Sequence, residues 1–177
     1  MDNINHYMNR RTIMVGDVNS GKTSQTFEIL QMFLEKGYAK KIAILDMGTN
    51  PVRGIGGKMP PPPDVPVLYL TSSISAPRLM GKDPNHIRLL AEENARSIER
   101  LFETFQQENR EIIFVNDATL YLQAGHLERF LEILNTTSTQ IINAYYGDAF
   151  SDSELTRREK KLTEDLMKTC DHLITLP

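Results

Sequence analysis

The sequence contains no tryptophan, one cysteine (Cys170) and no long apolar run. A single cysteine cannot form an internal disulfide, which fits a reducing compartment. None of the apolar runs approaches the roughly 18 residues of a membrane-spanning helix. The polar N-terminal residues also lack the apolar core of a signal peptide. We therefore expect a cytoplasmic protein without a membrane span.

An excess of either charge is also missing. The 177 residues include 20 Lys and Arg against 23 Asp and Glu, a net charge of −3. No block of about five like charges occurs, so the charge does not indicate a general nucleic-acid-binding surface and leaves room only for a local basic site. The length and the 40% hydrophobic content suit one domain over residues 1–177 that buries its own core.

Short apolar runs alternate along the chain with segments of helical periodicity. Strands are expected at residues 12–15, 41–45, 67–70, 111–115, 139–144 and 172–176. Helices are expected at residues 21–36, 85–107, 125–134 and 152–168. This alternation predicts an α/β fold, a three-layer α/β/α sandwich around a mainly parallel sheet. Ligands of such sheets bind beyond the C-terminal ends of the strands.

The sequence G-D-V-N-S-G-K-T at residues 16–23 matches the P-loop pattern G-x-x-x-x-G-K-[ST] between the first strand and the first helix. Its glycines let backbone N–H groups point inward at an anion, and the helix N-terminus attracts the same phosphates. Lys22 is expected to contact the β- and γ-phosphates, and the Thr23 hydroxyl is expected to bind Mg²⁺. The predicted nucleotide-binding residues are Gly16, Asp17, Val18, Asn19, Ser20, Gly21, Lys22, Thr23 and Ser24.

Two acidic residues follow buried strands at the predicted ligand edge, Asp46 and Asp117. Either can serve Mg²⁺, which takes carboxylate ligands beside phosphates. Ala118 follows Asp117 where many mechanical ATPases place a glutamate base, which argues against that branch. The guanine-reading N-K-x-D sequence is missing after the fifth strand, where Asn143 begins N-A-Y-Y. ATP is therefore favoured over GTP, with Mg²⁺ as the metal.

The motif at residues 16–23 resembles that of the P-loop NTPase superfamily. A weaker resemblance is to kinase and SIMIBI-type P-loop domains, including polynucleotide 5′-hydroxyl kinases and their relatives. It is carried by D-M-G from Asp46, by D-A-T-L from Asp117 and by the paired basic residues Arg157 and Arg158. The resemblance implies that Asp46 serves Mg²⁺ or an acceptor hydroxyl and that Arg158 belongs to a lid over the phosphates.

Two further features carry alternative interpretations. The basic residues around Arg158 form either a catalytic lid or a solvated helix face paired with Glu154 and Glu159. Residues 46–66 form a long loop with several glycines and four consecutive prolines, and loops of this length are usually functional or disordered. We expect this loop to contact a protein partner or a second copy of the chain.

Three functions remain open at this point. The first is Mg²⁺-dependent hydrolysis by a nucleotide-dependent switch that acts through a partner. The second is a phosphotransferase, in which Asp46 orients an acceptor hydroxyl, Lys22 neutralises the phosphates and Arg158 closes the lid. The third is a nucleotide-binding subunit that does not hydrolyse its ligand.

Overall fold

A computed structural model of the chain describes residues 3–177 and contains a six-stranded sheet in the order β3-β2-β4-β5-β1-β6. The strands are β1 (Arg11–Gly16), β2 (Ile42–Asp46), β3 (Leu68–Thr71), β4 (Ile112–Asn116), β5 (Thr139–Tyr145) and β6 (His172–Thr175). Every pairing between neighbouring strands is parallel. The predicted parallel α/β sheet is therefore confirmed.

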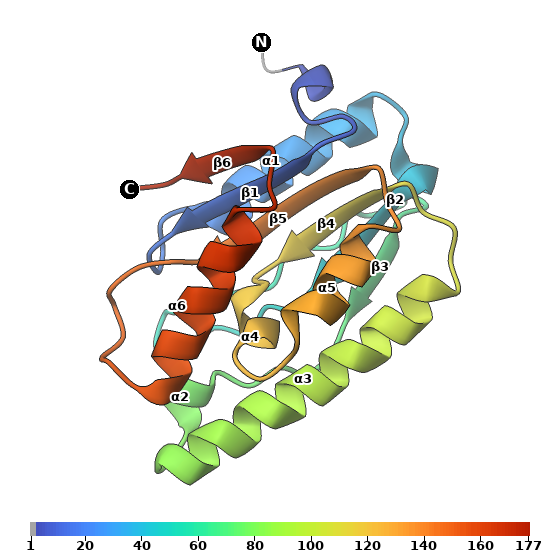
Figure 1. Cartoon of the computed structure of the whole chain (residues 1–177). Coiled ribbons are helices and arrows are strands. Elements are labelled where there is room, and N and C mark those ends of the chain that lie inside the picture. Colours follow the sequence, from blue (N-terminus) through green and yellow to red (C-terminus); the bar gives the residue numbers. More distant parts are fainter. Residues whose placement is uncertain (1–2) are drawn as a thin grey trace.

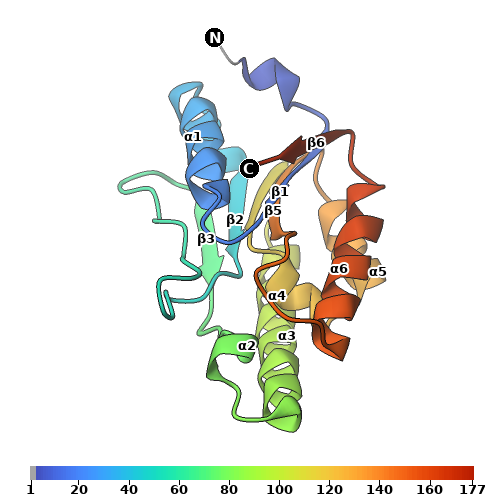
Figure 2. The same cartoon turned by 90° about the vertical axis from the view of Figure 1, so that its left-hand side faces the viewer.

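Helices cover both faces of the sheet and give the three predicted layers (Figures 1 and 2). One face is covered by the short 3-10 helix η1 (Ile4–His6) and by α1 (Lys22–Glu35). The opposite face is covered by α3 (Pro84–Gln106), α4 (Thr119–Leu122), α5 (Leu127–Leu134) and α6 (Glu154–Met167). None of the helices within residues 3–177 is long and apolar enough to cross a membrane.

The two faces of the sheet bury separate hydrophobic cores. Phe33 of α1 packs edge-on against Phe114 of β4, with ring centroids 5.7 Å apart. On the other face, Phe102 of α3 contacts Tyr121 and Phe130, with centroids 5.0 and 6.0 Å away. Because both faces are covered, the residues of β2 and β4 are buried throughout. This explains why these strands read as continuous apolar runs instead of alternating patterns.

Two helices were not predicted, α2 (Pro77–Met80) and α4. Each spans only four residues, too few for a helical periodicity to show in the sequence. η2 (Ala39–Lys41), one further 3-10 turn, leads into β2. The N-cap of α6 is Ser153, whose hydroxyl accepts a hydrogen bond of 3.1 Å from the amide of Thr156.

The long connection between β2 and β3 contains no helix or strand, only an isolated bridge between Val52 and Ile55. It is nevertheless fastened to the sheet. The ammonium of Lys58 donates to the carbonyls of Gly48 (2.7 Å) and Ser72 (2.9 Å) and to the hydroxyl of Thr71 (2.6 Å). The start of this loop therefore lies at the same sheet edge as the end of β1, where the predicted P-loop begins.

Candidate functional site

The loop from β1 to α1 carries the predicted phosphate-binding motif. Gly21 caps α1 with a φ of 88°, in the left-handed region that favours glycine. A Cβ at Gly16 would lie 2.5 Å from Ser20 Oγ and 3.0 Å from the carbonyl oxygen of Leu176, so that position is restricted by space. The loop therefore turns sharply and presents the N-terminus of α1 toward the sheet edge, where an anion is favoured.

Lys22 lies across this loop. Its ammonium donates to the carbonyls of Gly16 (3.1 Å) and Asp17 (2.5 Å) and to Ser20 Oγ (3.3 Å). Burial lowers the pKa of Lys22, and the nearby Asp117 and Asp17 oppose that shift. The Lys22 ammonium is therefore held over the loop by three oxygen acceptors, and phosphate oxygens can take their place when a ligand binds.

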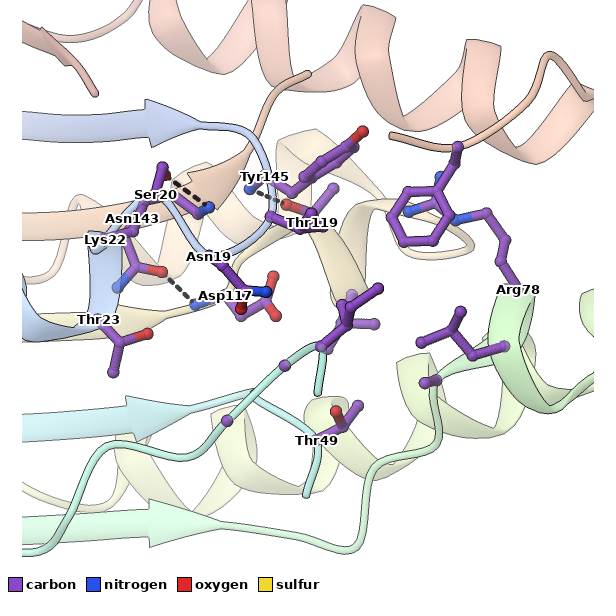
Figure 3. A pocket seen from close by; sticks show the side chains of 18 of the residues that line it. Asn19, Ser20, Lys22, Thr23, Thr49, Arg78, Asp117, Thr119, Asn143 and Tyr145 are labelled. Atoms are coloured by element: carbon purple, nitrogen blue, oxygen red, sulfur yellow. Dashed lines mark hydrogen bonds between the residues drawn. The ribbon is translucent and has the colours of Figure 1, made fainter. Parts of the chain in front are cut away.

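A cavity of about 370 Å³ opens beside the P-loop. Figure 3 shows Thr23 at one end of it, Arg78 at the other and Asp117 between them. Residues 18–24 border it, whereas Gly16 and Asp17 do not. The remaining walls come from the β2–β3 loop, α2, the end of β4, α4 and the end of β5 and its loop: Thr49, Ile55, Gly56, Gly57, Ala76, Pro77, Arg78, Leu79, Asp117, Thr119, Leu120, Gln123, Asn143, Tyr145 and Phe150. Its size and mixed polar and apolar walls are typical of a small-molecule site.

The residue that meets Thr23 across the sheet is Asn116, the last residue of β4. Its Oδ1 accepts hydrogen bonds of 3.0 Å from the Thr23 hydroxyl and from the amide of Asn143. Asn143 also donates to Thr26 (2.9 Å). In P-loop NTPases, an aspartate lies near the P-loop threonine and its metal ion. An amide holds that place here, and sequence reasoning missed it because the acid one residue later drew the assignment.

Asp117 follows Asn116 and borders the cavity. Its backbone has a φ of 58°, and its amide donates a 2.8 Å hydrogen bond to Asn143 Oδ1. The carboxylate itself makes no hydrogen bond within residues 3–177. Burial raises the pKa of Asp117 to about 6, and Lys22 opposes that shift. The acid is therefore free to act on a ligand and titrates close to neutral pH.

Asp46 lies in a different environment from the one predicted for it. The residue is fully buried and does not border the cavity. Its Oδ1 accepts from Gly48 N (3.0 Å) and Asn116 Nδ2 (2.8 Å), and its Oδ2 accepts from Met59 N (2.6 Å) and the Tyr69 hydroxyl (2.7 Å). Four donors occupy both oxygens, and the carboxylate fastens the β2–β3 loop. A role for Asp46 in binding Mg²⁺ or orienting an acceptor stays a prediction.

Arg158, predicted to belong to a catalytic lid, also lies away from the cavity, and its role stays a prediction. Arg158 donates to the carbonyl of Gly125 (2.5 Å), on the surface between α4 and α5, and does not border the cavity. The arginine that does border it is Arg78 of α2. Its guanidinium pairs with buried Glu159 of α6 and lies 3.9 Å from the ring centroid of Phe150. Glu159, predicted as an exposed salt-bridge partner, faces the interior.

The segment after β5 packs on the P-loop. Asp17 accepts hydrogen bonds from Val18 N (2.7 Å) and Asp148 N (3.1 Å). These bonds lower the pKa of Asp17, the one from Val18 most strongly. A Cβ at Gly147 would lie 2.4 Å from the Asp17 carboxyl carbon, so only glycine fits this close approach. Asp17 therefore links the P-loop to the segment that carries Phe150.

A metal ion would rely on few protein ligands. Residues 3–177 contain no group of three or more His, Cys, Asp or Glu side chains placed to share an ion. Thr23 and Asp117 supply oxygen atoms at the cavity wall. This set fits Mg²⁺, which binds one or two protein oxygens together with substrate phosphates and water.

The strand order separates the P-loop strand from the strand that carries Asp117. β5 lies between β1 and β4. The weaker resemblance to kinase and SIMIBI-type domains, which rests on Asp46, Asp117 and the pair Arg157 and Arg158, stays a prediction.

Together, the sheet and the β1–loop–α1 unit make up an α/β fold with a parallel sheet, in which a tight loop joins the first strand to the first long helix. No protein-family model and no curated protein sequence matches the chain. Among solved structures it is similar to the Pif1 helicase from Candida albicans, at 13% identity and a TM-score of 0.41. The match covers 95% of this chain and 36% of the helicase chain, so this chain spans about a third of that protein's length.

Proposed function

We propose that this chain binds a nucleoside triphosphate with Mg²⁺ and hydrolyses it, with Asp117 as the general base. The observation that carries the proposal is the placement of Lys22, Thr23 and Asp117 on the walls of one cavity beside a helix N-terminus. The absence of an N-K-x-D sequence favours ATP over GTP.

Binding begins with the P-loop. The backbone N–H groups from Val18 to Thr23 surround the β-phosphate, and Lys22 exchanges its carbonyl partners for oxygens of the β- and γ-phosphates. Thr23 would hold Mg²⁺ together with the phosphates, which leaves Asp117 for the attacking water, and the ion would neutralise charge on the transferred group. Asn116 accepts the Thr23 hydrogen bond in the present geometry and positions that hydroxyl.

Asp117 then serves the attacking water. At pH 7 a carboxyl with a pKa of about 6 is mostly ionised, and it is basic enough to take a proton. The water oxygen bonds to the γ-phosphorus, the bond from phosphorus to the bridging oxygen breaks, and the proton passes to Asp117. In this proposal the catalytic carboxylate is that of Asp117 and not that of Asp46, and Arg158 takes no part in the reaction.

We further propose that the β2–β3 loop reports the nucleotide state to a protein partner or a second copy of the chain. Ile55, Gly56 and Gly57 border the cavity near the expected γ-phosphate, whereas Pro60 and Pro61, farther along the same loop, are exposed. A change at the phosphate can therefore alter a surface away from the chemistry.

The binding step is tested by thermal unfolding with and without MgATP. We expect MgATP to raise the melting temperature of the wild type and to have no effect on Lys22→Ala. Lys36→Ala, at the exposed C-terminal end of the same helix, is the matched control and should respond like the wild type. If no triphosphate stabilises the wild type, the proposed function is wrong.

Release of ADP and phosphate tests the reaction separately. We expect slow hydrolysis in the wild type and none in Asp117→Asn, although that variant should still be stabilised by MgATP. A rate that changes with protein concentration would identify a second copy as the partner. Binding without any ADP formation would leave the chain as a nucleotide-binding subunit.

A further inference from the structure

The cavity beside the P-loop extends from Thr23 at one end to Arg78 at the other. Its far end, here called the distal subsite, is bordered by Arg78, Leu120, Gln123, Tyr145 and Phe150. Figure 3 shows Arg78 at the end of the cavity opposite Thr23, with Asp117 between. These side chains come from α2, α4, β5 and the β5–α6 segment, so four parts of the chain converge on a region that the proposed hydrolysis does not use.

Gln123 provides the first sign of a ligand there. The residue is 4% exposed, and its Nε2 donates a 2.9 Å hydrogen bond to Glu159 Oε2. That bond fixes the amide orientation and leaves Oε1 as the free acceptor. Oε1 is buried and has no hydrogen-bond partner within residues 3–177. Buried side-chain oxygens rarely lack a partner, so a donor from a ligand would complete this one.

Arg78 provides the second sign. Its hydrogen bonds within residues 3–177, to Thr156 (3.1 Å) and to Glu159, both come from Nη1. A guanidinium has five N–H donors, so the Nε and Nη2 donors remain for another group. The Phe150 ring, 3.9 Å away, and the ion pair with Glu159 hold the planar group in place. A fixed guanidinium with donors to spare suits an anionic group with two oxygens, a carboxylate or a phosphate.

We propose that the distal subsite binds a small organic anion that carries a hydroxyl group, with the carboxylate or phosphate on Arg78 and the hydroxyl on Gln123 Oε1. Leu120 and the Tyr145 and Phe150 rings enclose its carbon atoms. This inference rests on the proposed function only in placing the ligand beside a bound nucleotide. It assigns a second ligand to the cavity, next to the acid that the nucleotide reaction uses.

The test measures thermal stabilisation of the full chain by four probes in the presence of saturating MgADP. The probes are glycerate and glycerol 3-phosphate, with propionate and propyl phosphate as counterparts that lack the hydroxyls. We expect one of the hydroxylated anions to raise the melting temperature further, and its counterpart to do so at roughly tenfold higher concentration. A response to glycerate alone identifies a carboxylate ligand, and a response to glycerol 3-phosphate alone identifies a phosphate.

Two variants connect that response to the subsite. Gln123→Met should respond equally to the hydroxylated probe and its counterpart, because the acceptor is gone and the volume is similar. Arg78→Lys keeps the charge but loses the planar fork, and we expect it to weaken every effective probe about tenfold. Gln107→Met and Arg157→Lys are matched controls on exposed helix positions and should behave like the wild type.

The outcomes separate this inference from the proposed function. If MgADP stabilises the protein but none of the probes does, or if both subsite variants respond as the wild type does, the distal subsite is wrong while nucleotide binding stands. If MgADP itself gives no stabilisation and a hydroxylated anion still binds through Arg78 and Gln123, the subsite stands and the proposed function is wrong.

Discussion

The amide at position 116 is explained by its four hydrogen-bond partners. Asn116 Oδ1 accepts from Thr23 and Asn143, while its Nδ2 donates to Asp46 Oδ1 (2.8 Å) and to the carbonyl of Gly57 (3.1 Å). An aspartate here could accept the first two hydrogen bonds but could not donate the other two. Because buried Asp46 fastens the loop at this point, only a side chain with both a donor and an acceptor completes the network.

Asn116→Asp should therefore destabilise the protein even though it restores the acid usual in P-loop NTPases. It places two carboxylates in hydrogen-bonding distance in a buried network, which raises the pKa of one of them. We expect a loss of about 2–4 kcal/mol in the free energy of unfolding at pH 7.5. The loss should be smaller at pH 5, because one proton is then shared between the two carboxylates. Urea unfolding at both pH values measures it, with Asn109→Asp at an exposed site as the control. Equal losses at both pH values would contradict this explanation.

Asp117 carries a stability cost that follows from its position. Its pKa is raised from 3.8 to about 6, mainly by burial. The folded state thus binds the proton more tightly than the unfolded state does. The stability that the folded state gains from this tighter proton binding is complete below pH 3.8, and it is lost as the pH rises through about 6. At 1.36 kcal/mol per pKa unit, the cost at pH 8 is at most about 3 kcal/mol.

Asp117→Asn should therefore be more stable than the wild type and inactive. Asparagine tolerates the left-handed φ of 58° at this position. We expect a gain of about 1–2 kcal/mol in the free energy of unfolding at pH 8 that disappears near pH 4.

Wild-type hydrolysis should rise with pH through about 6 and level off above 7, because the base must be ionised. Urea unfolding and pH–rate profiles check both parts. An active Asp117→Asn variant would exclude this acid as the base.

At the scale of elements, the β2–β3 loop depends on one carboxylate and one ammonium. Asp46 accepts from the backbone of Gly48 and Met59, and Lys58 donates to three oxygens at or just after the C-terminal ends of β2 and β3. These bonds bring a segment without regular hydrogen bonding to the cavity wall. The rest of the loop, including the four prolines, is exposed at several positions.

Asp46→Asn should loosen this loop without removing nucleotide binding. An asparagine amide group faces two donors whichever way it is turned, so the N–H of Gly48 or of Met59 loses its acceptor. Such a loss costs about 1–3 kcal/mol. We expect faster amide exchange over residues 47–59 and retained stabilisation by MgATP. Asp64→Asn, an exposed change at a loop residue with a φ of 56°, is the control. Complete loss of MgATP binding in a folded Asp46→Asn variant would return Asp46 to the metal site.

At the scale of the whole molecule, patterns along the chain predicted the parallel sheet correctly, and they placed residues 16–23 between the first strand and the first long helix, where the structure has them. These features depend on local periodicity and on spacing within eight residues. The site beyond the P-loop depends on which strands are neighbours, and the sequence does not show that order. Asp46 and Asp117 both end apolar strands, yet only the fold shows that one is enclosed by four donors and that the other borders the cavity. Arg78 and Glu159 likewise meet only through packing of α2 against α6.

The connections around the cavity also predict how far nucleotide binding is felt. The P-loop contacts the β5–α6 segment through Asp17 and Asp148, and Thr23 contacts the β2–β3 loop through Asn116 and Gly57. A ligand that orders the P-loop should therefore slow amide exchange on both sides of it. A ligand concentration of 100 times the dissociation constant adds about 2.7 kcal/mol to the free energy of unfolding. We expect MgATP to protect residues 16–24, 47–59 and 146–150.

Hydrogen exchange followed by mass spectrometry measures this directly, with Lys22→Ala as the control that should show no change. The opposite edge of the sheet, around Arg10 and Asp171, shares none of these contacts and should exchange at the same rate with and without nucleotide. Protection confined to residues 16–24 would mean that the two flanking segments do not sense the phosphates, and the β2–β3 loop could then not report the nucleotide state to a partner.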